Sequence, residues 1–124
     1  MNRRYSIREQ FTKDICELTI WCYCKGYAVT DGEAYRTKEQ QAIYVSSGRS
    51  KVKVSQHQKR LARDLHIWDE FKGAKYITDS QWREVGRKWE SMNSKNRWGG
   101  RFGIRKINYN KKIGWDKYHF ERRS

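Results

Sequence analysis

The stretch SQHQKRLARDLHIW, residues 55–68, changes character halfway along its length. Its second half, residues 61–68, has leucine or isoleucine at three odd-numbered positions and predicts a strand. Its first half is basic, yet it holds one of the three histidines of the chain. His57 precedes Asp64 by seven residues, so the two side chains could meet at one ion where a loop enters the strand. Such a spacing also arises by chance, and two surface or hydrogen-bonded core residues would explain it equally.

Three other segments have the period of amphipathic helices, with apolar residues recurring every three or four positions. The first is predicted over residues 6–25 and stops at Gly26, and the second over residues 37–48. The third, residues 80–92, follows a capping box that begins at Thr78. Its apolar residues share one face, which predicts core packing rather than a binding platform. These residues are Trp82, Val85, Trp89 and Met92.

Short strands are predicted between and after these helices. They cover residues 27–31, residues 61–68, part of residues 72–79 and part of the last ten residues. This order predicts an α+β fold, in which helices pack on a small, mostly antiparallel sheet. The 124 residues contain no proline, no repeat and no low-complexity linker, so one domain is expected over residues 1–124.

The charge and the aromatic content limit the kinds of partner. The net charge is +14, and aromatic residues make up 15% of the chain. The charge predicts a polyanionic neighbour, which is nucleic acid, anionic lipid or an anionic cell envelope, and the aromatic residues predict a folded protein. No apolar run approaches the ~20 residues of a membrane span, and the basic start lacks the apolar region of a signal peptide. We therefore expect a protein made in the cytoplasm, without a transmembrane segment.

Three cysteines lie in the first predicted helix, namely Cys16, Cys22 and Cys24. An odd number of cysteines without a secretory signal argues against a disulfide framework. A Cys-x-Cys pair can bind metal, but no histidine lies near this one. Buried free thiols are therefore expected.

A second pairing of an acid with a histidine lies near the C-terminus. In DKYH, residues 116–119, Asp116 precedes His119 by three positions. A catalytic zinc site takes three protein ligands, His nitrogen and Asp oxygen among them, and keeps one position for water. His119 is thus the candidate third ligand beside His57 and Asp64, and Asp116 is the candidate general base. From spacing alone, ordinary surface or core roles remain the alternative for all four residues.

Together these motifs resemble a known family. Residues 55–64 fit the pattern S-x-H-x-x-G-x-A-x-D except at Arg60, and residues 116–119 fit the distal pattern Glu-or-Asp-x-x-His. Both patterns resemble the zinc D-Ala-D-Ala carboxypeptidase and L-alanyl-D-glutamate endopeptidase family. WREVGRKW, residues 82–89, and GGRF, residues 99–102, resemble the small phage endolysin branch of that family.

The resemblance implies a zinc ion bound by three ligands: His57, Asp64 and His119. It implies that Asp116 is the catalytic base. Arg36 would bind a substrate carboxylate or stabilise the oxyanion, because a guanidinium has the geometry for the first and the charge for the second. Ser55 would contact the substrate or hold the loop that carries the metal ligand. Taken alone, Arg36 would be a surface arginine at the start of a helix.

Three positions need separate expectations. Arg60 stands where the family has glycine, which implies that the backbone there does not need a positive φ. Residues 104–115 form an insertion between the distal motifs, and its lysines and aromatic residues suggest a hairpin beside the cleft or an ordinary surface excursion. His66 is expected to be a half-buried strand residue or the partner of a ligand, and not a ligand itself.

The implied function is that of a zinc-dependent peptidoglycan peptidase that hydrolyses stem-peptide amide bonds. A phage endolysin of the L-alanyl-D-glutamate endopeptidase or D,D-carboxypeptidase type would stay in the host cytoplasm until release to the cell wall. It would act as a monomer, attracted by its charge to the anionic envelope surface. The alternative is a basic nucleic-acid-binding protein or a small metal-dependent nuclease. That alternative does not explain the order of the peptidase motifs, so no specific nucleic-acid partner is expected.

Overall fold

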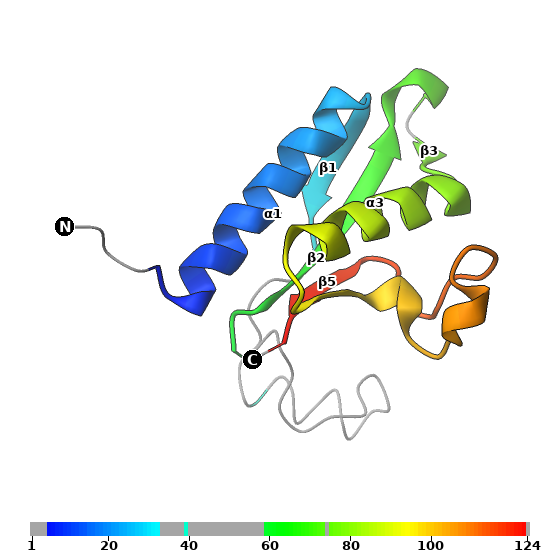
Figure 1. Ribbon diagram of the computed structural model, residues 1–124. Coiled ribbons are helices and arrows are strands. Elements are labelled where there is room, and N and C mark those ends of the chain that lie inside the picture. The colour runs from blue at the N-terminus through cyan, green and yellow to red at the C-terminus, as the bar shows by residue number, and fades with distance from the viewer. Residues whose placement is uncertain (1–4, 33–38, 40–58, 74, 124) are drawn as a thin grey trace.

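The protein is seen here in a computed structural model, which describes residues 5–32, 39, 59–73 and 75–123 (Figure 1). Three candidate site residues, Arg36, Ser55 and His57, lie outside the described residues. Almost all of the predicted second helix, residues 37–48, lies outside them too. Within the described part of the chain, no helix has both the length and the apolar character to cross a membrane.

The first helix, α1 (Ile7–Cys24), agrees with its predicted boundaries. Ser6 caps it, because its hydroxyl accepts a hydrogen bond from the backbone N–H of Glu9. Just past the other end, Gly26 has a φ of +87°, a left-handed conformation that glycine adopts without strain. The apolar period of this helix runs through Ile7, Phe11, Ile15, Leu18 and Cys22, and all of these except Ile7 are buried.

Among the described residues, five antiparallel strands form the sheet: β1 (Tyr27–Asp31), β2 (Ala62–Asp69), β3 (Lys75–Tyr76), β4 (Asn96–Trp98) and β5 (His119–Arg122). The order is β1-β2-β5-β4, and β3 pairs with the far end of β2. β2 is the longest strand and the one that pairs with three others. The predicted α+β fold, with helices on a small antiparallel sheet, is confirmed.

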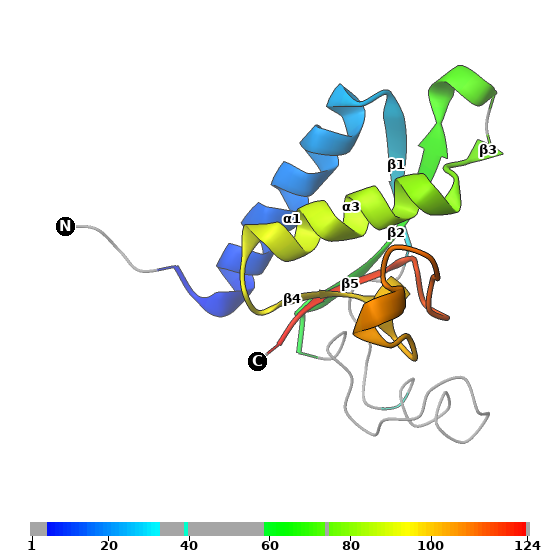
Figure 2. The ribbon, with the colours of Figure 1, turned by 45° about the vertical axis from the view of Figure 1, so that its right-hand side comes forward.

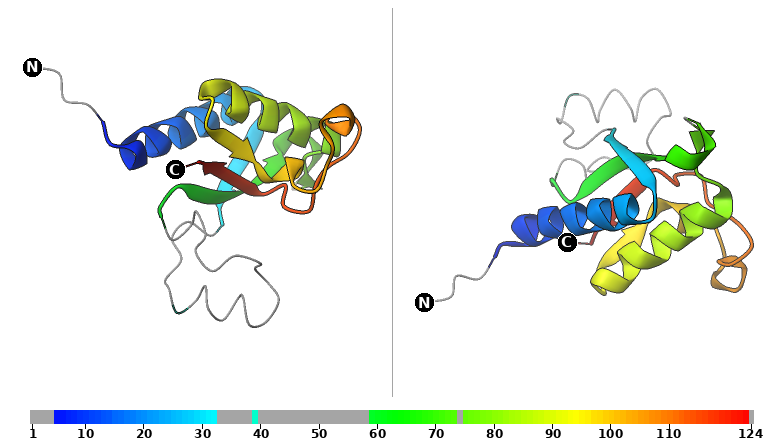
Figure 3. Two further views of the ribbon diagram at one scale, coloured as in Figure 1. Left: turned by 60° about the horizontal axis from the view of Figure 1, so that its bottom comes forward. Right: turned by 90° about the horizontal axis from the view of Figure 1, so that it is seen from above.

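The second described helix, α3 (Asp79–Met92), begins at the predicted capping box. The Thr78 hydroxyl accepts from the N–H of Gln81, and the Gln81 side chain accepts from the N–H of Thr78. α3 crosses α1, and both helices lie on the same face of the sheet (Figure 2, Figure 3). Side chains of β2 therefore alternate between this covered face and the opposite face.

Tryptophans fill the space between the helices and the sheet. Trp82, Trp89 and Trp98 are 0% exposed, as is Phe120 of β5. Phe11 of α1 meets the Trp89 ring edge-on, with 5.7 Å between ring centroids. The apolar face of α3 is thus core, as its helical period predicted.

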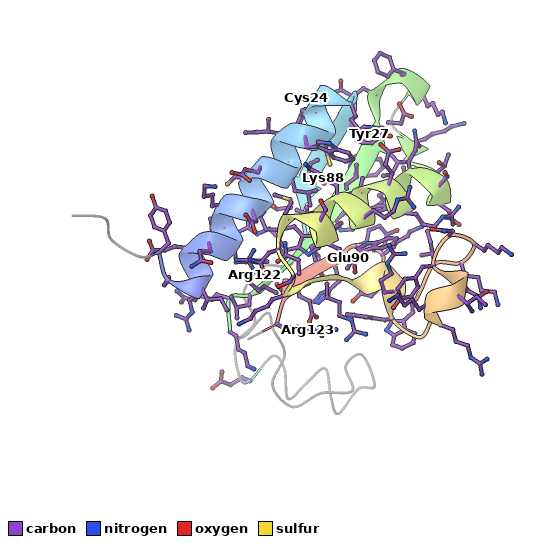
Figure 4. All side chains as sticks on the ribbon, viewed as in Figure 1. Cys24, Tyr27, Lys88, Glu90, Arg122 and Arg123 are labelled. Carbon is purple, nitrogen blue, oxygen red and sulfur yellow. The ribbon has the colours of Figure 1, made fainter. Side chains whose placement is uncertain are left out.

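A buried ion pair joins the last strand to the first helix. Arg122, labelled in Figure 4, is 1% exposed. Its guanidinium donates to the Asp14 carboxylate of α1. Its Nε also donates to Oδ1 of Asn96 at 2.9 Å. Removing Asp14 would leave a buried unpaired charge, so this pair links the position of α1 to that of β5.

The cysteines are free, but only one of them is buried. Cys22 lies on the core face of α1, and burial raises the pKa of its thiol to about 12. Cys16 and Cys24 are exposed, so the expectation of buried thiols is wrong for these two. The reason is the helical period: Cys24 is two positions beyond Cys22 and points about 200° further around the helix.

The insertion at residues 104–115 does not form the suggested hairpin. It contains a short 3₁₀ helix, η3 (Lys106–Asn108), followed by turns. Local backbone hydrogen bonds within this segment take the place of cross-strand pairing. Arg101 holds the segment against α3 through two contacts. Its Nε lies 3.0 Å from Oε1 of Glu90 on α3, and its Nη1 donates to the carbonyl oxygen of Tyr109 in the segment at 3.1 Å.

Arg60 has a φ of +60° and is the one non-glycine residue with a positive φ among the described residues. The expectation that arginine would exclude this conformation is therefore wrong. The path of the chain into β2 requires the left-handed backbone, and arginine adopts it at a cost of roughly 1 kcal/mol relative to glycine.

Replacing Arg60 by glycine and by alanine separates the backbone effect from the side-chain effect. Both variants lack the guanidinium, but only glycine adopts this φ without strain. Arg60→Gly should therefore exceed Arg60→Ala in free energy of unfolding by about 1 kcal/mol. Urea unfolding followed by tryptophan fluorescence measures the difference. An alanine variant as stable as the glycine variant would contradict a left-handed backbone at this residue.

Candidate metal centre

The pairing of β2 with β5 brings two candidate ligands together. Asp64 and His119 are direct partners in the register of these antiparallel strands, so their side chains share one face of the sheet. Nδ1 of His119 lies 3.3 Å from Oδ1 of Asp64. The two residues are 55 positions apart in the chain. This proximity is what the metal-site hypothesis requires, and their role as ligands stays a prediction.

Glu121 holds the other side of the imidazole. It follows His119 by two residues on β5, so its side chain lies on the same face, and its Oε1 is 2.7 Å from Nε2 of His119. A carboxylate bound to one ring nitrogen fixes the direction of the other, an arrangement common behind metal-binding histidines. Nδ1 is therefore the nitrogen that His119 can offer to a metal ion.

The surrounding charges decide the protonation of His119, which is 6% exposed. Burial alone would lower the pKa of the imidazole, but hydrogen bonds to Asp64 and Glu121 and the nearby charge of Asp116 outweigh it. The net result raises the pKa of His119 to about 9. In the metal-free protein the imidazolium is thus the cation that balances these carboxylates.

Asp116 lies at the solvent side of this cluster. Its Oδ2 is 3.9 Å from Nδ1 of His119, and its side chain is 40% exposed. The backbone N–H of His119 donates to the carbonyl oxygen of Asp116 at 3.1 Å, a turn that fixes the three-residue spacing. A carboxylate that is near the ligand pair and open to water is well placed to accept a proton from a reacting water molecule.

Gly99 allows this turn to approach the sheet. It begins the 3₁₀ helix η2 (Gly99–Arg101), directly after β4. A Cβ atom at this position would collide with the carbonyl oxygen of Asp116 and lie 2.9 Å from Cβ of His119. Because these atoms belong to the backbone or its first side-chain carbon, they cannot move aside cheaply. The GGRF motif thus supports the site through close packing.

The donors suit a zinc ion, although the described residues alone do not complete a site. Within the part of the chain that the structure describes, no group of three His, Cys, Asp or Glu side chains could hold a metal ion. Asp64 supplies an oxygen and His119 a nitrogen, both of which zinc accepts. The third predicted ligand, His57, lies outside the described residues, as do Arg36 and Ser55. The two described candidates therefore supply donor atoms that zinc accepts.

The roles of Glu121 and Gly99 were not recognised from the sequence. The sequence did contain a signal for Glu121, because a strand residue two positions after the candidate ligand His119 lies on the same face of the sheet. Gly99 acts through a long-range contact, which no local pattern reveals. His66 is a half-buried strand residue, as expected, and its Nδ1 lies 3.2 Å from the hydroxyl of Tyr76.

The same arrangement of helices and strands occurs in a solved peptidase. The protein is similar to the L-Ala D-Glu endopeptidase ChiX from Serratia marcescens, with a TM-score of 0.59 over 98% of this chain and 90% of that chain, at 17% sequence identity. The protein has the ChiX fold. It is also similar to the D,D-pentapeptidase VanY of a VanB-type resistance cassette, in complex with Zn(II), with a TM-score of 0.49 and 19% identity over 91% of this chain and 70% of that chain. Comparison with protein-family models and with curated proteins finds no match.

The ChiX fold confirms what the sequence motifs implied about the architecture. The comparison does so at 17% sequence identity. The similarity therefore establishes the fold alone, and the proposed roles of individual residues rest on the distances and contacts described above.

Adding one methyl group at Gly99 should disturb the site and the fold together. Gly99→Ala forces the Asp116 carbonyl away from β4, and we expect a loss of about 1–3 kcal/mol of stability, with weaker zinc binding. Gly73→Ala is the matched control, because Gly73 has a φ of +66° but open space around its Cβ position. The control should lose only the backbone cost of about 1 kcal/mol and keep its zinc affinity. Competition with a chelating dye measures zinc binding, and equal affinities in both variants would contradict this role of Gly99.

Stability of the metal-free protein should depend on pH through His119. Its pKa is about 9 in the folded chain, against ~6.5 in an unfolded chain. Its contribution is thus fully present below about pH 6.5 and is lost as the pH rises through about 9. Thermal unfolding of chelator-treated protein should show a Tm that falls across this window, and His119→Gln should flatten the fall. Zinc-loaded protein should lack it, because Nδ1 would then hold the metal in place of the proton. An equal fall with and without zinc would contradict the ligand role.

Proposed function

We propose that the protein is a zinc-dependent peptidase that hydrolyses amide bonds in peptidoglycan stem peptides. This peptidase would be either an L-alanyl-D-glutamate endopeptidase or a D,D-carboxypeptidase. The observation that carries the proposal is the pairing of Asp64 with His119 beside Asp116, on the fold of an L-Ala D-Glu endopeptidase. An oxygen donor, a nitrogen donor and a solvent-accessible carboxylate together are what metal-assisted amide hydrolysis requires.

Three side chains of this protein would hold the ion: His57, Asp64 and His119. Zinc bound there would lower the pKa of a water ligand and polarise the scissile carbonyl group. Asp64 and His119 are presented by paired strands, so the sheet keeps their spacing constant. Glu121 orients the imidazole by accepting a hydrogen bond from Nε2–H, which directs Nδ1 toward the ion.

Asp116 is the proposed general base. Its carboxylate would take the proton of the attacking water and pass it to the departing amine. The turn that joins it to His119 keeps it near the metal ligands without making it one. Arg36 is proposed to pair with a substrate carboxylate or with the oxyanion, and Ser55 to contact the substrate.

We extend the proposal to the role of a phage endolysin. A net charge of +14 would draw a monomeric protein to the anionic bacterial envelope. The protein would accumulate in the host cytoplasm, reach the cell wall after the membrane is breached, and lyse the host. Peptidoglycan would be its substrate, and no specific nucleic acid its partner.

Hydrolysis by the zinc-loaded protein tests the proposal directly. Purified protein should release new amino groups from peptidoglycan and clear suspensions of permeabilised Gram-negative cells. Asp116→Asn should keep its zinc but lose activity by at least about 100-fold, because the proton acceptor is gone. His57→Ala should lose both zinc and activity. Mass analysis of the digested muropeptides identifies the bond that is cut.

Glu17→Gln is the matched control for a lost carboxylate, since Glu17 is an exposed residue of α1 paired with Lys13. It should keep full activity. Absence of new amino groups with zinc-loaded wild type would refute the peptidase proposal, and an active Asp116→Asn variant would refute the assignment of the base.

A further inference from the structure

A row of aromatic side chains continues from the metal centre along β2. Asp64, His66 and Trp68 alternate with core residues of this strand, so they face away from α1 and α3. Tyr76 of β3 is the register partner of Trp68 and belongs to the same face. Four residues form what we name the aromatic row: His66, Trp68, Tyr76 and Tyr118. Tyr118 stands at the edge of the row, because its ring also meets the core Trp82 of α3 edge-on, with 5.3 Å between ring centroids.

The rings of the aromatic row hold one another in place. Trp68 and Tyr76 stack, with centroids 4.0 Å apart and 16° between their planes. Tyr118 lies against His66 with centroids 4.7 Å apart, and the Tyr76 hydroxyl is within 3.2 Å of Nδ1 of His66. Tyr76 is nevertheless 41% exposed. The row is thus a fixed aromatic surface that is partly open to solvent.

Small side chains border the aromatic row on the side of β1. Ala28 and Thr30 are the register partners of Trp68 and His66. At the end near the metal centre stands Gly32, where a Cβ atom would lie 3.0 Å from Nε2 of His66. No bulky residue of β1 therefore stands beside the rings, and the row is continuous with the candidate metal centre.

We propose that the aromatic row binds an amino-sugar ring of the glycan strand that carries the stem peptide. This inference rests on the proposed peptidase function and names part of its substrate. A pyranose ring has apolar C–H faces and a polar edge. The faces match the aromatic rings, and the edge matches the tyrosine hydroxyl and the imidazole of the row.

The length of β2 relates this sugar site to one bond of the substrate. Strand residues rise about 3.3 Å each, which places His66 and Trp68 about 7 and 13 Å from Asp64. In peptidoglycan one alanine and one lactyl group separate the sugar from the L-Ala–D-Glu bond, about 7 Å of extended chain. Four residues and the lactyl group separate it from the terminal D-Ala–D-Ala bond, about 17 Å. A sugar at the His66 end of the aromatic row, which the Tyr76 hydroxyl also reaches, therefore matches the spacing to the L-Ala–D-Glu bond.

Two substrates of equal peptide sequence test the sugar site. One is the disaccharide pentapeptide that ends in D-Ala–D-Ala, and the other is the same pentapeptide with an N-acetyl group in place of the lactyl sugar. Zinc-loaded wild type should cut both at L-Ala–D-Glu, with kcat/KM about tenfold higher for the sugar-bearing substrate. Tyr76→Leu should lose this preference through a higher KM, while cleavage of the sugar-free peptide stays unchanged. Phe71→Leu is the matched control, because Phe71 is an 85% exposed aromatic residue outside the row, and it should keep the preference.

Sugar binding can also be measured without catalysis. N-Acetylmuramoyl-L-alanine titrated into chelator-treated protein should change the fluorescence of Trp68, with a Kd raised about tenfold by Tyr76→Leu and unchanged by Asp116→Asn. Three outcomes would overturn the proposal while leaving the peptidase function intact. They are cleavage without any preference for the sugar, a Tyr76→Leu variant that is equally impaired on both substrates, and cleavage at D-Ala–D-Ala. Saturable, Tyr76-dependent binding with no hydrolysis of either substrate would support the sugar site and refute the peptidase function.

Discussion

The antiparallel pairing of β2 with β5 is the constraint on which the site depends. It places Asp64 opposite His119 and gives both side chains the same face of the sheet. The pairing is in turn supported from the covered face, where Phe120 is fully buried and Arg122 binds Asp14 of α1. A shift of one residue in this register would send His119 into the core and Phe120 to the opposite face. The hydrophobic core therefore protects the geometry of the polar site.

The charge of the site is opposite to that of the molecule. Around His119 the carboxylates of Asp64, Asp116 and Glu121 converge, whereas the chain as a whole carries a net charge of +14. Such a cluster needs a cation, either the proton on the imidazole or a bound metal ion. The two charge distributions suit different tasks, since the basic surface favours approach to an anionic polymer and the acidic centre favours binding of a divalent ion.

The division of the sheet into two faces separates stability from recognition. α1 and α3 cover one face and bury Trp82, Trp89 and Trp98, while the candidate metal centre and the aromatic row lie toward the other. β2 contributes side chains to both faces, because successive residues of a strand point to opposite sides. Packing of its core residues therefore fixes the order in which a substrate would meet Asp64, His66 and Trp68 on the other face. The extended strand thus holds these side chains at a fixed spacing, which is the spacing that the proposed sugar and peptide would have to match.

Much of the fold was predictable from the sequence, because α1, α3, β1 and β2 are set by local periods and caps, as Ser6 and Thr78 show. The strand β4 was not predicted. The motifs also singled out Asp64, Asp116 and His119, which the structure brings together, whereas nothing in the described residues bears on His57. Residue preference misled at Arg60, where the path of the chain outweighs a preference of about 1 kcal/mol. Only the tertiary structure decided the register of β2 with β5, the contact between Glu121 and His119, and the close approach allowed by Gly99. These features join residues whose distance in space is fixed by packing and not by neighbours in the chain.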